Sequence, residues 1–126
     1  MTFKPRATLL PDAFSNSVSG TTTDAYVSAL DWRSCAGWNS KSIVVANTGD
    51  TNSMTYKAYL YTLIDSDYYY LYSDLGQEEF DVVAGDSDIL HFNYAYDRVI
   101  VLVKSTSAGS ATTYKLDAIG NKGGSA

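Results

Sequence analysis

The sequence predicts an all-β protein, an antiparallel β-sandwich of the jelly-roll or Ig-like kind with about eight strands. Ser and Thr together number 27 and Tyr numbers 11, and these residues suit pleated strands and the turns between them. Good helix formers are scarce, because 12 Asp stand against two Glu, one Gln and six Lys. Turn residues gather every ~8–12 residues, as in sandwiches. At 126 residues the chain suffices for one domain with its own core.

The first 24 residues are predicted to form an extended N-terminal arm. They contain both prolines and show no regular apolar period. We expect their isolated apolar residues to be buried on a neighbouring subunit; these are Phe3, Leu9, Leu10 and Phe14. Residues 25–120 then form the sandwich, and residues 121–126 form a C-terminal tail.

Strand-like runs and turns alternate from residue 25 onward. Residues 26–32 and the short apolar run 42–47 are the first two predicted strands, and the cluster TGDTN at 48–52 is typical of a turn. Residues 54–64 form a long strand. Its alternation places one set of side chains on a common face: Thr55, Lys57, Tyr59, Tyr61 and Leu63.

Five further strands complete the predicted sandwich. They comprise residues 68–72, 79–83, 89–92, 98–104 and 111–119. The run RVIVLVK at 98–104 is the most apolar in the chain, and it suits a strand that is buried on both faces. The strand at 111–119 alternates again between apolar and polar residues.

Charge and cysteine usage exclude several partners. The net charge of −5 and the pI near 4.5 argue against nucleic acid, because binding its backbone needs clustered Lys and Arg. No apolar run approaches the ~18 residues of a membrane helix, so we expect no membrane partner. The single cysteine, Cys35, excludes an intramolecular disulfide framework. No GxGxxG or P-loop motif occurs, and we expect no cofactor.

Catalytic chemistry finds little support in the sequence. The one histidine, His91, could form a thiol triad only with Cys35 and an Asn or Asp, and no nucleophile motif surrounds either residue. The only two glutamates, Glu78 and Glu79, are neighbours and would point to opposite faces of a strand. Glycoside hydrolysis needs carboxylates that face each other across ~5–10 Å. We therefore expect no catalytic residues and no enzyme.

Two Asp-Ser-Asp runs, at residues 65–67 and 86–88, raise the question of a metal site. An EF-hand loop would continue with a third oxygen ligand, a Gly and a Glu at position twelve, and neither run does. Both are better interpreted as hairpin turns, with a weak calcium site built from two loops as the alternative. One Cys and one His cannot fill a zinc site by themselves. No metal-ligating residue is predicted.

Tyrosines are the conspicuous feature of the sequence. Tyr59 and Tyr61 share one face of the strand at 54–64, and Tyr68, Tyr69 and Tyr70 follow. Tyrosine is enriched in protein interfaces, its ring also stacks on sugars, and cross-strand pairs stabilise sheets by themselves. These five tyrosines are interface candidates, and glycan is the alternative ligand.

Several turn and strand signatures recur in a familiar order. They are WNSKSIVVANTG at 38–49, MTYK at 54–57, VAGD at 83–86, YDRVIVLVKS at 96–105 and TYK at 113–115. This order resembles small β-sandwich virion proteins of tailed bacteriophages and related viruses, such as capsid decoration, head-fibre or tail accessory proteins. Ig-like extracellular modules share much of the pattern.

The resemblance implies a non-enzymatic virion part that is assembled in the host cytoplasm. Capsid decoration proteins typically occur as oligomers, often trimers, on the shell surface. The hypothesis is a virion structural protein that self-associates and docks on a major capsid or tail protein. The alternative is a carbohydrate-binding or adhesive β-sandwich module.

Overall fold

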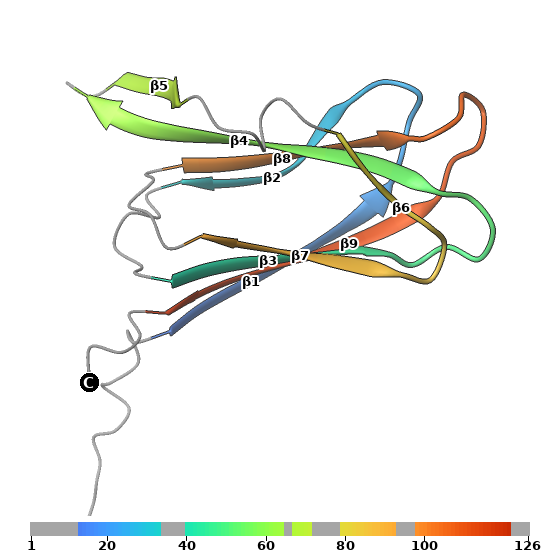
Figure 1. Cartoon of the computed structure of the whole chain (residues 1–126), viewed down its shortest axis with the longest axis horizontal. Coiled ribbons are helices and arrows are strands. Elements are labelled where there is room, and N and C mark those ends of the chain that lie inside the picture. The colour runs from blue at the N-terminus through green and yellow to red at the C-terminus, as the bar shows by residue number, and fades with distance from the viewer. Residues whose placement is uncertain (1–12, 34–39, 65–66, 72–78, 93–97, 122–126) are drawn as a thin grey trace, which may run out of the picture.

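The computed structural model describes residues 13–33, 40–64, 67–71, 79–92 and 98–121. Within these ranges the chain forms nine β-strands (Figure 1). They are β1 (Ala13–Thr21), β2 (Val27–Arg33), β3 (Ser40–Asn47), β4 (Met54–Ile64), β5 (Asp67–Leu71), β6 (Phe80–Val82), β7 (Ser87–Phe92), β8 (Arg98–Ser105) and β9 (Thr113–Asn121). The described ranges contain no helix that could cross a membrane.

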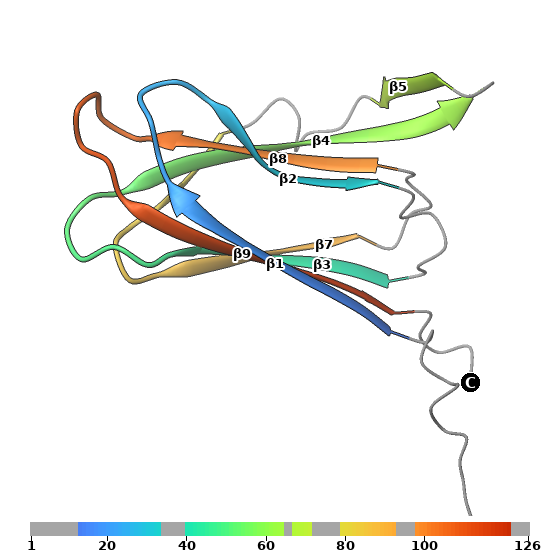
Figure 2. The ribbon, with the colours of Figure 1, turned by 180° about the vertical axis from the view of Figure 1, so that it is seen from behind.

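The strands form two antiparallel sheets that face each other (Figures 1 and 2). The four-stranded sheet has the order β1-β9-β3-β7, and the five-stranded sheet has the order β2-β8-β4-β5, with β6 also paired to β4. Every connection except β4–β5 and β5–β6 crosses from one sheet to the other. This alternation is that of a jelly roll, not of the Ig fold. The predicted all-β sandwich is confirmed.

Alternate residues of the strands meet between the sheets and form the core. In β3 and β8, buried positions alternate regularly with half-buried ones. The core comprises Leu30, Trp32, Ile43, Val45, Met54, Tyr56, Ala58, Leu60, Val82, Leu90, Val99, Val101, Val103, Tyr114, Leu116 and Ala118. Strand β8 is therefore buried on one face only. The predicted burial on both faces was wrong, because no further layer covers the outer side of the five-stranded sheet in the described structure.

Residues 13–21, which the sequence assigned to the arm, form strand β1 of the four-stranded sheet. They pair with β9 along their whole length, from Ala13 opposite Asn121 to Thr21 opposite Thr113. Their sequence, AFSNSVSGT, lacks a strong apolar alternation, and Val18 packs against the core. Strand β1 is thus held in the sheet mainly by its backbone pairing with β9, and not by an apolar face of its own. The other eight strands match the predicted ones within a few residues. Residues 1–12 and 122–126 lie outside the described ranges.

A buried polar network joins the two sheets at one end of the sandwich. The Asn47 amide donates to the carbonyls of Asn52 and Val82 at 2.9 Å, and its oxygen accepts from the Thr112 hydroxyl at 2.8 Å. Thr22 accepts from the Thr112 backbone N–H and shares a hydrogen bond with the hydroxyl of Ser105. Because these bonds satisfy buried polar groups on strands and loops of both sheets, they fix how the sheets meet.

Candidate functional site

The outer side of the five-stranded sheet carries most of the described tyrosines that point away from the core. The register of β4 and β8 places Lys57 opposite Leu102, Tyr59 opposite Ile100 and Tyr61 opposite Arg98. All six are half-buried, whereas the residues between them, Ala58, Leu60, Val99 and Val101, are buried in the core. We call this surface the tyrosine face; it consists of Tyr26, Lys57, Tyr59, Tyr61, Arg98, Ile100, Leu102 and Lys104.

At one end of the tyrosine face, two lysines lie over tyrosine rings. The Lys57 ammonium is 4.5 Å from the ring centre of Tyr26 and 5.3 Å from that of Tyr59, and Lys104 is 4.9 Å from Tyr26. The Tyr26 hydroxyl donates to Glu79 at 2.5 Å, and Lys104 lies 3.9 Å from the same carboxylate. Partial burial and the Glu79 contact raise the pKa of the Tyr26 phenol, so it stays neutral and remains a donor.

At the other end, an arginine links Tyr61 to an acidic residue. The Arg98 guanidinium lies 5.6 Å from the Tyr61 ring centre and donates two hydrogen bonds of 2.8 Å to Asp31. Arg33 contacts the same carboxylate at 3.3 Å. Hydrogen bonds from Arg98 are the main cause that lowers the pKa of Asp31. The planar, two-bonded geometry holds the guanidinium in place beside the ring.

Between these two charged ends, the middle of the tyrosine face is apolar. Ile100 and Leu102 occupy the outward positions of the central strand β8, and Tyr59 adjoins Ile100 across the strands. The tyrosine face therefore offers aliphatic and aromatic surface with charged groups around it. It contains no thiol or histidine, and the carboxylates at its ends, Asp31 and Glu79, each contact a cation.

The single histidine of the sequence, His91, lies on the opposite side of the molecule from the tyrosine face. His91 on β7 is exposed, and its Nδ1 is 2.8 Å from the Ser42 hydroxyl on β3. Among the described residues, no carboxylate hydrogen-bonds to this imidazole, and Cys35 lies outside the described ranges. A Ser–His pair on an open sheet face lacks the orienting acid and the enclosed pocket of a hydrolase. Ser42 was not identified from the sequence, because the pairing of β3 with β7 was not predictable from local pattern.

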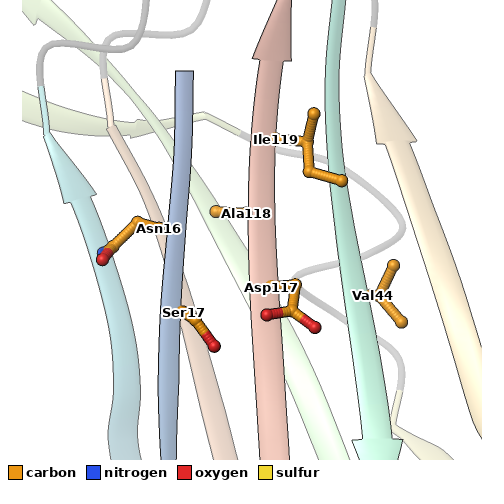
Figure 3. A pocket seen from close by; sticks show the side chains of 6 residues that line it. All are labelled: Asn16, Ser17, Val44, Asp117, Ala118 and Ile119. Carbon is orange, nitrogen blue, oxygen red and sulfur yellow. The ribbon is translucent and has the colours of Figure 1, made fainter. Parts of the chain in front are cut away.

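A depression of about 450 Å³ lies on the outer side of the four-stranded sheet (Figure 3). Ser17 on β1, Asp117 and Ile119 on β9, and Val44 on β3 lie side by side around it. Asp117 is its single carboxylate, and Lys115 lies 3.9 Å from that group. One carboxylate without a second acid or a base does not make a hydrolytic site.

The Asp-rich turns do not gather into a metal site in the described structure. Asp86 accepts a hydrogen bond from the backbone N–H of Ser87, and Asp88 accepts one of 2.9 Å from the Tyr56 hydroxyl. The described residues contain no cluster of three or more metal-ligating side chains. The turn before β7 also connects β6 of one sheet to β7 of the other, so the predicted hairpin at 86–88 was wrong. The turn at 65–67 lies largely outside the described residues.

The structure places the predicted interface residues in different regions. It brings Tyr59 and Tyr61 together on the tyrosine face. Tyr68, Tyr69 and Tyr70 belong to β5, where the backbone of Tyr70 is paired with Tyr61. Phe14 belongs to β1, opposite Gly120. Phe3, Leu9 and Leu10 lie outside the described ranges.

Several members of the tyrosine face were not singled out from the sequence. Arg98, Ile100, Leu102 and Lys104 alternate along β8, so the period of two could have placed them on one face. Only the pairing of β8 with β4 shows that this face adjoins Tyr59 and Tyr61.

No family model matches the chain, and no curated protein matches it either. Among solved structures, it is similar to a Bacillus endospore appendage that forms disulfide-linked pili (11% identity, 86% of each chain, TM-score 0.50). It is also similar to the Yersinia pseudotuberculosis-derived mitogen (15% identity, 83% of this chain and 84% of that one, TM-score 0.50). The SPBc2 prophage-derived protein YomS aligns over 84% of this chain and 95% of its own (12% identity, TM-score 0.44). At these identities the likeness is one of fold.

Proposed function

We propose that this chain is a non-enzymatic structural component of a virus particle, which self-associates and docks on a major capsid or tail protein. The single observation that carries the docking part is the tyrosine face. Its outward Tyr59, Tyr61, Ile100 and Leu102 form a half-buried apolar surface without a covering layer in the described structure. Phe3, Leu9, Leu10, Phe14 and Tyr68 to Tyr70 remain further contact candidates from the sequence.

The chemistry of the tyrosine face is that of a protein contact. Interfaces place aromatic and aliphatic side chains at the centre and charged groups at the rim, and Tyr and Arg are enriched where binding energy concentrates. Here Ile100 and Leu102 lie centrally, while Arg98 and Lys104 occupy the two ends of the same strand. Burial of such a surface is favourable by ~25 cal/mol per Å² of apolar area.

A binding role also agrees with the other outer surface. The Ser42–His91 pair is exposed, and the depression beside Asp117 has one carboxylate. Neither assembles the nucleophile, base and charge-stabilising groups that a reaction needs. These surfaces therefore support a role in structural assembly better than they support catalysis.

Cross-linking in purified particles of the source virus tests the proposal. An amine-reactive reagent should join Lys57 or Lys104, on the tyrosine face, to another virion protein. Lys115 on the four-stranded sheet is the matched control, since its side chain is more exposed than that of Lys104. Absence of the chain from the particles would overturn the virion role. Cross-links that arise from Lys115 alone would overturn docking through the tyrosine face.

A carbohydrate-binding or adhesive module is the second candidate, and Tyr59 and Tyr61 are the observation that favours it. Sugar rings stack on uncovered aromatic faces. Lys57 over Tyr59 and Arg98 over Tyr61 occupy one face of each ring, which favours protein contact instead. Binding on a glycan array that disappears in Tyr59→Ala would reverse this order.

A further inference from the structure

We propose that β1 pairs edge to edge with β1 of a second copy of this chain. The contact would be antiparallel about a two-fold axis, and it would join two four-stranded sheets into one continuous sheet. This inference rests on the self-association proposed above and specifies the surface that forms it. It concerns the side edge of the sandwich and not the tyrosine face.

The first observation is the position of β1 in its sheet. In the order β1-β9-β3-β7, it pairs with β9 over all nine of its residues and has no strand on its other side within the described structure. The backbone N–H and C=O groups of alternate residues therefore point outward along a long, regular edge. Such an edge is a template for another strand.

The second observation is the lack of any feature that would block pairing at β1. Its sequence, AFSNSVSGT, contains no charged residue and no proline, and its register with β9 has no bulge. Charges, prolines, bulges and short strands are the devices by which proteins protect their sheet edges.

The other sheet edges carry these devices. Strand β2 has a register shift between Ser28 and Leu30 and carries Asp31 and Arg33. Strand β6 spans three residues, β5 spans five and begins with Asp67, and β7 carries Asp88. The unprotected edge is thus confined to β1 among the described strands, which singles it out as a contact.

The third observation is that β1 is compatible with its own copy. Full overlap of two antiparallel copies places Ser17, the central residue, opposite Ser17 of the partner subunit. The same register pairs Ser19 with position 15 and Val18 with position 16 of the partner, and no like charges meet. A two-fold contact of this kind uses the same surface on both chains and closes at two subunits. A second copy therefore fits the edge better than a charged partner would.

Disulfide trapping tests both the contact and its register. In a Cys35→Ser background, which lacks the native thiol, Ser17→Cys places two thiols directly opposite each other, with Cβ atoms ~4.5–5.5 Å apart. Ser19→Cys is the matched control, because it is exposed on the same strand face but is displaced from its counterpart by about 13 Å along the strand direction in this register. Mild oxidation should give a covalent dimer with Ser17→Cys and little or none with Ser19→Cys. Equal cross-linking of both variants, or of neither, would overturn the inference.

A lysine variant provides a second, reversible readout. Ser17→Lys is compatible with folding, because position 17 is exposed and opposite Asp117 within its own sheet. Across the two-fold axis, however, it brings two lysines together and should weaken the dimer about fivefold. Ser87→Lys, at an exposed position on the opposite edge strand β7, should leave dimerisation unchanged.

Light scattering separates failure of this inference from failure of the proposed function. We expect the wild-type chain to have twice its 13.7 kDa mass. A wild-type monomer at all concentrations would overturn self-association itself. A stable oligomer that Ser17→Lys and the cysteine variants do not perturb would retain self-association and overturn the β1 edge as its surface. A mass of three chains would also overturn it, since an isologous contact closes at two.

Discussion

The outer faces of the two sheets differ in chemistry although the strands beneath them have the same geometry. The face of the four-stranded sheet carries small hydroxyl groups, scattered aliphatic side chains, the exposed His91 and the Lys115–Asp117 ion pair, and among the described residues it has no cluster of aromatic rings. The tyrosine face carries aromatic rings that contact Lys and Arg. Core-facing positions on both sheets are mostly apolar. The fold therefore restricts the inward positions to residues that suit the core. The residues at the outward positions determine which face can bind a partner.

Both outer faces depend on the buried hydrogen bonds that hold the two sheets together, and Asn47→Ala, which removes the centre of that network, should have the largest effect of the variants considered. The substitution leaves the Val82 and Asn52 carbonyls and the Thr112 hydroxyl without this buried partner. Loss of these bonds should lower the free energy of unfolding by about 3 kcal/mol. Urea denaturation monitored by circular dichroism measures it.

Asn52→Ala is the matched control for that experiment. The Asn52 side chain donates to the Ala111 carbonyl in an exposed hydrogen bond. Its removal should cost about 0.5 kcal/mol, because water can replace the bond. Equal losses for the two asparagines would show that the buried network does not join the sheets.

Replacing the tyrosines should separate binding from folding. Tyr59→Ala with Tyr61→Ala removes two half-buried rings from the tyrosine face while leaving the core residue between them, Leu60, in place. Docking on the partner protein should weaken by about 2 kcal/mol or more, which is roughly thirtyfold, if these rings are central contacts. Co-sedimentation with virus particles that lack the chain measures the change.

A matched comparison decides how the tyrosine result is interpreted. The same double variant should still unfold cooperatively, and its light-scattering mass should stay that of the wild type if self-association uses β1. Loss of docking with an unchanged mass would place the two contacts on different surfaces. Unchanged docking would contradict the role of the tyrosine face.

Sequence pattern predicted the strands better than their partners. The apolar and turn periods located eight strands, because long strands such as β3 and β8 alternate between buried and half-buried residues and turn residues separate the runs. Strand β1 was not predicted, because it is held in the sheet by pairing with β9, about a hundred residues away in the chain. Ala13, for example, lies opposite Asn121. Local pattern carries no information on such distant pairings.

The same limit applies to the candidate site. That Tyr59 and Tyr61 share a face follows from the period of two. Contacts between Arg98 and Asp31, or between Tyr26 and Glu79, join residues of different strands and loops. They depend on the jelly-roll strand order, which the turn pattern left open between two kinds of sandwich.

The arginine end of the tyrosine face should show a pH-dependent contribution to stability. Asp31→Asn keeps the shape of the side chain but removes its charge beside Arg98 and Arg33. Because the contact is partly exposed, the loss near neutral pH should be about 1 kcal/mol at most. Denaturant titrations at several pH values measure it.

The direction of this pH dependence follows from the lowered pKa of Asp31. The folded protein binds the proton less readily than the unfolded chain, whose carboxyl has a pKa near 3.8. The stabilisation is thus complete above that value and is lost as the pH falls through the lower pKa of the folded state. The difference between wild type and Asp31→Asn should shrink in acid. A constant difference would mean that the hydrogen-bond shape, not the charge, is responsible.

The smallest effect is expected on the other face, and it tests the comparison most directly. Ile89 on β7 is 68% exposed, and Val44 lies opposite it in the sheet. Ile89→Ser removes an exposed aliphatic side chain and should change the free energy of unfolding by no more than about 0.5 kcal/mol. It should alter neither docking nor the oligomeric mass, since it lies away from both the tyrosine face and the β1 edge. Docking that falls in Ile89→Ser as much as in the double tyrosine variant would show that both outer faces contact the partner. Exposed aliphatic side chains of the four-stranded sheet would then contribute to binding as much as the tyrosine rings do.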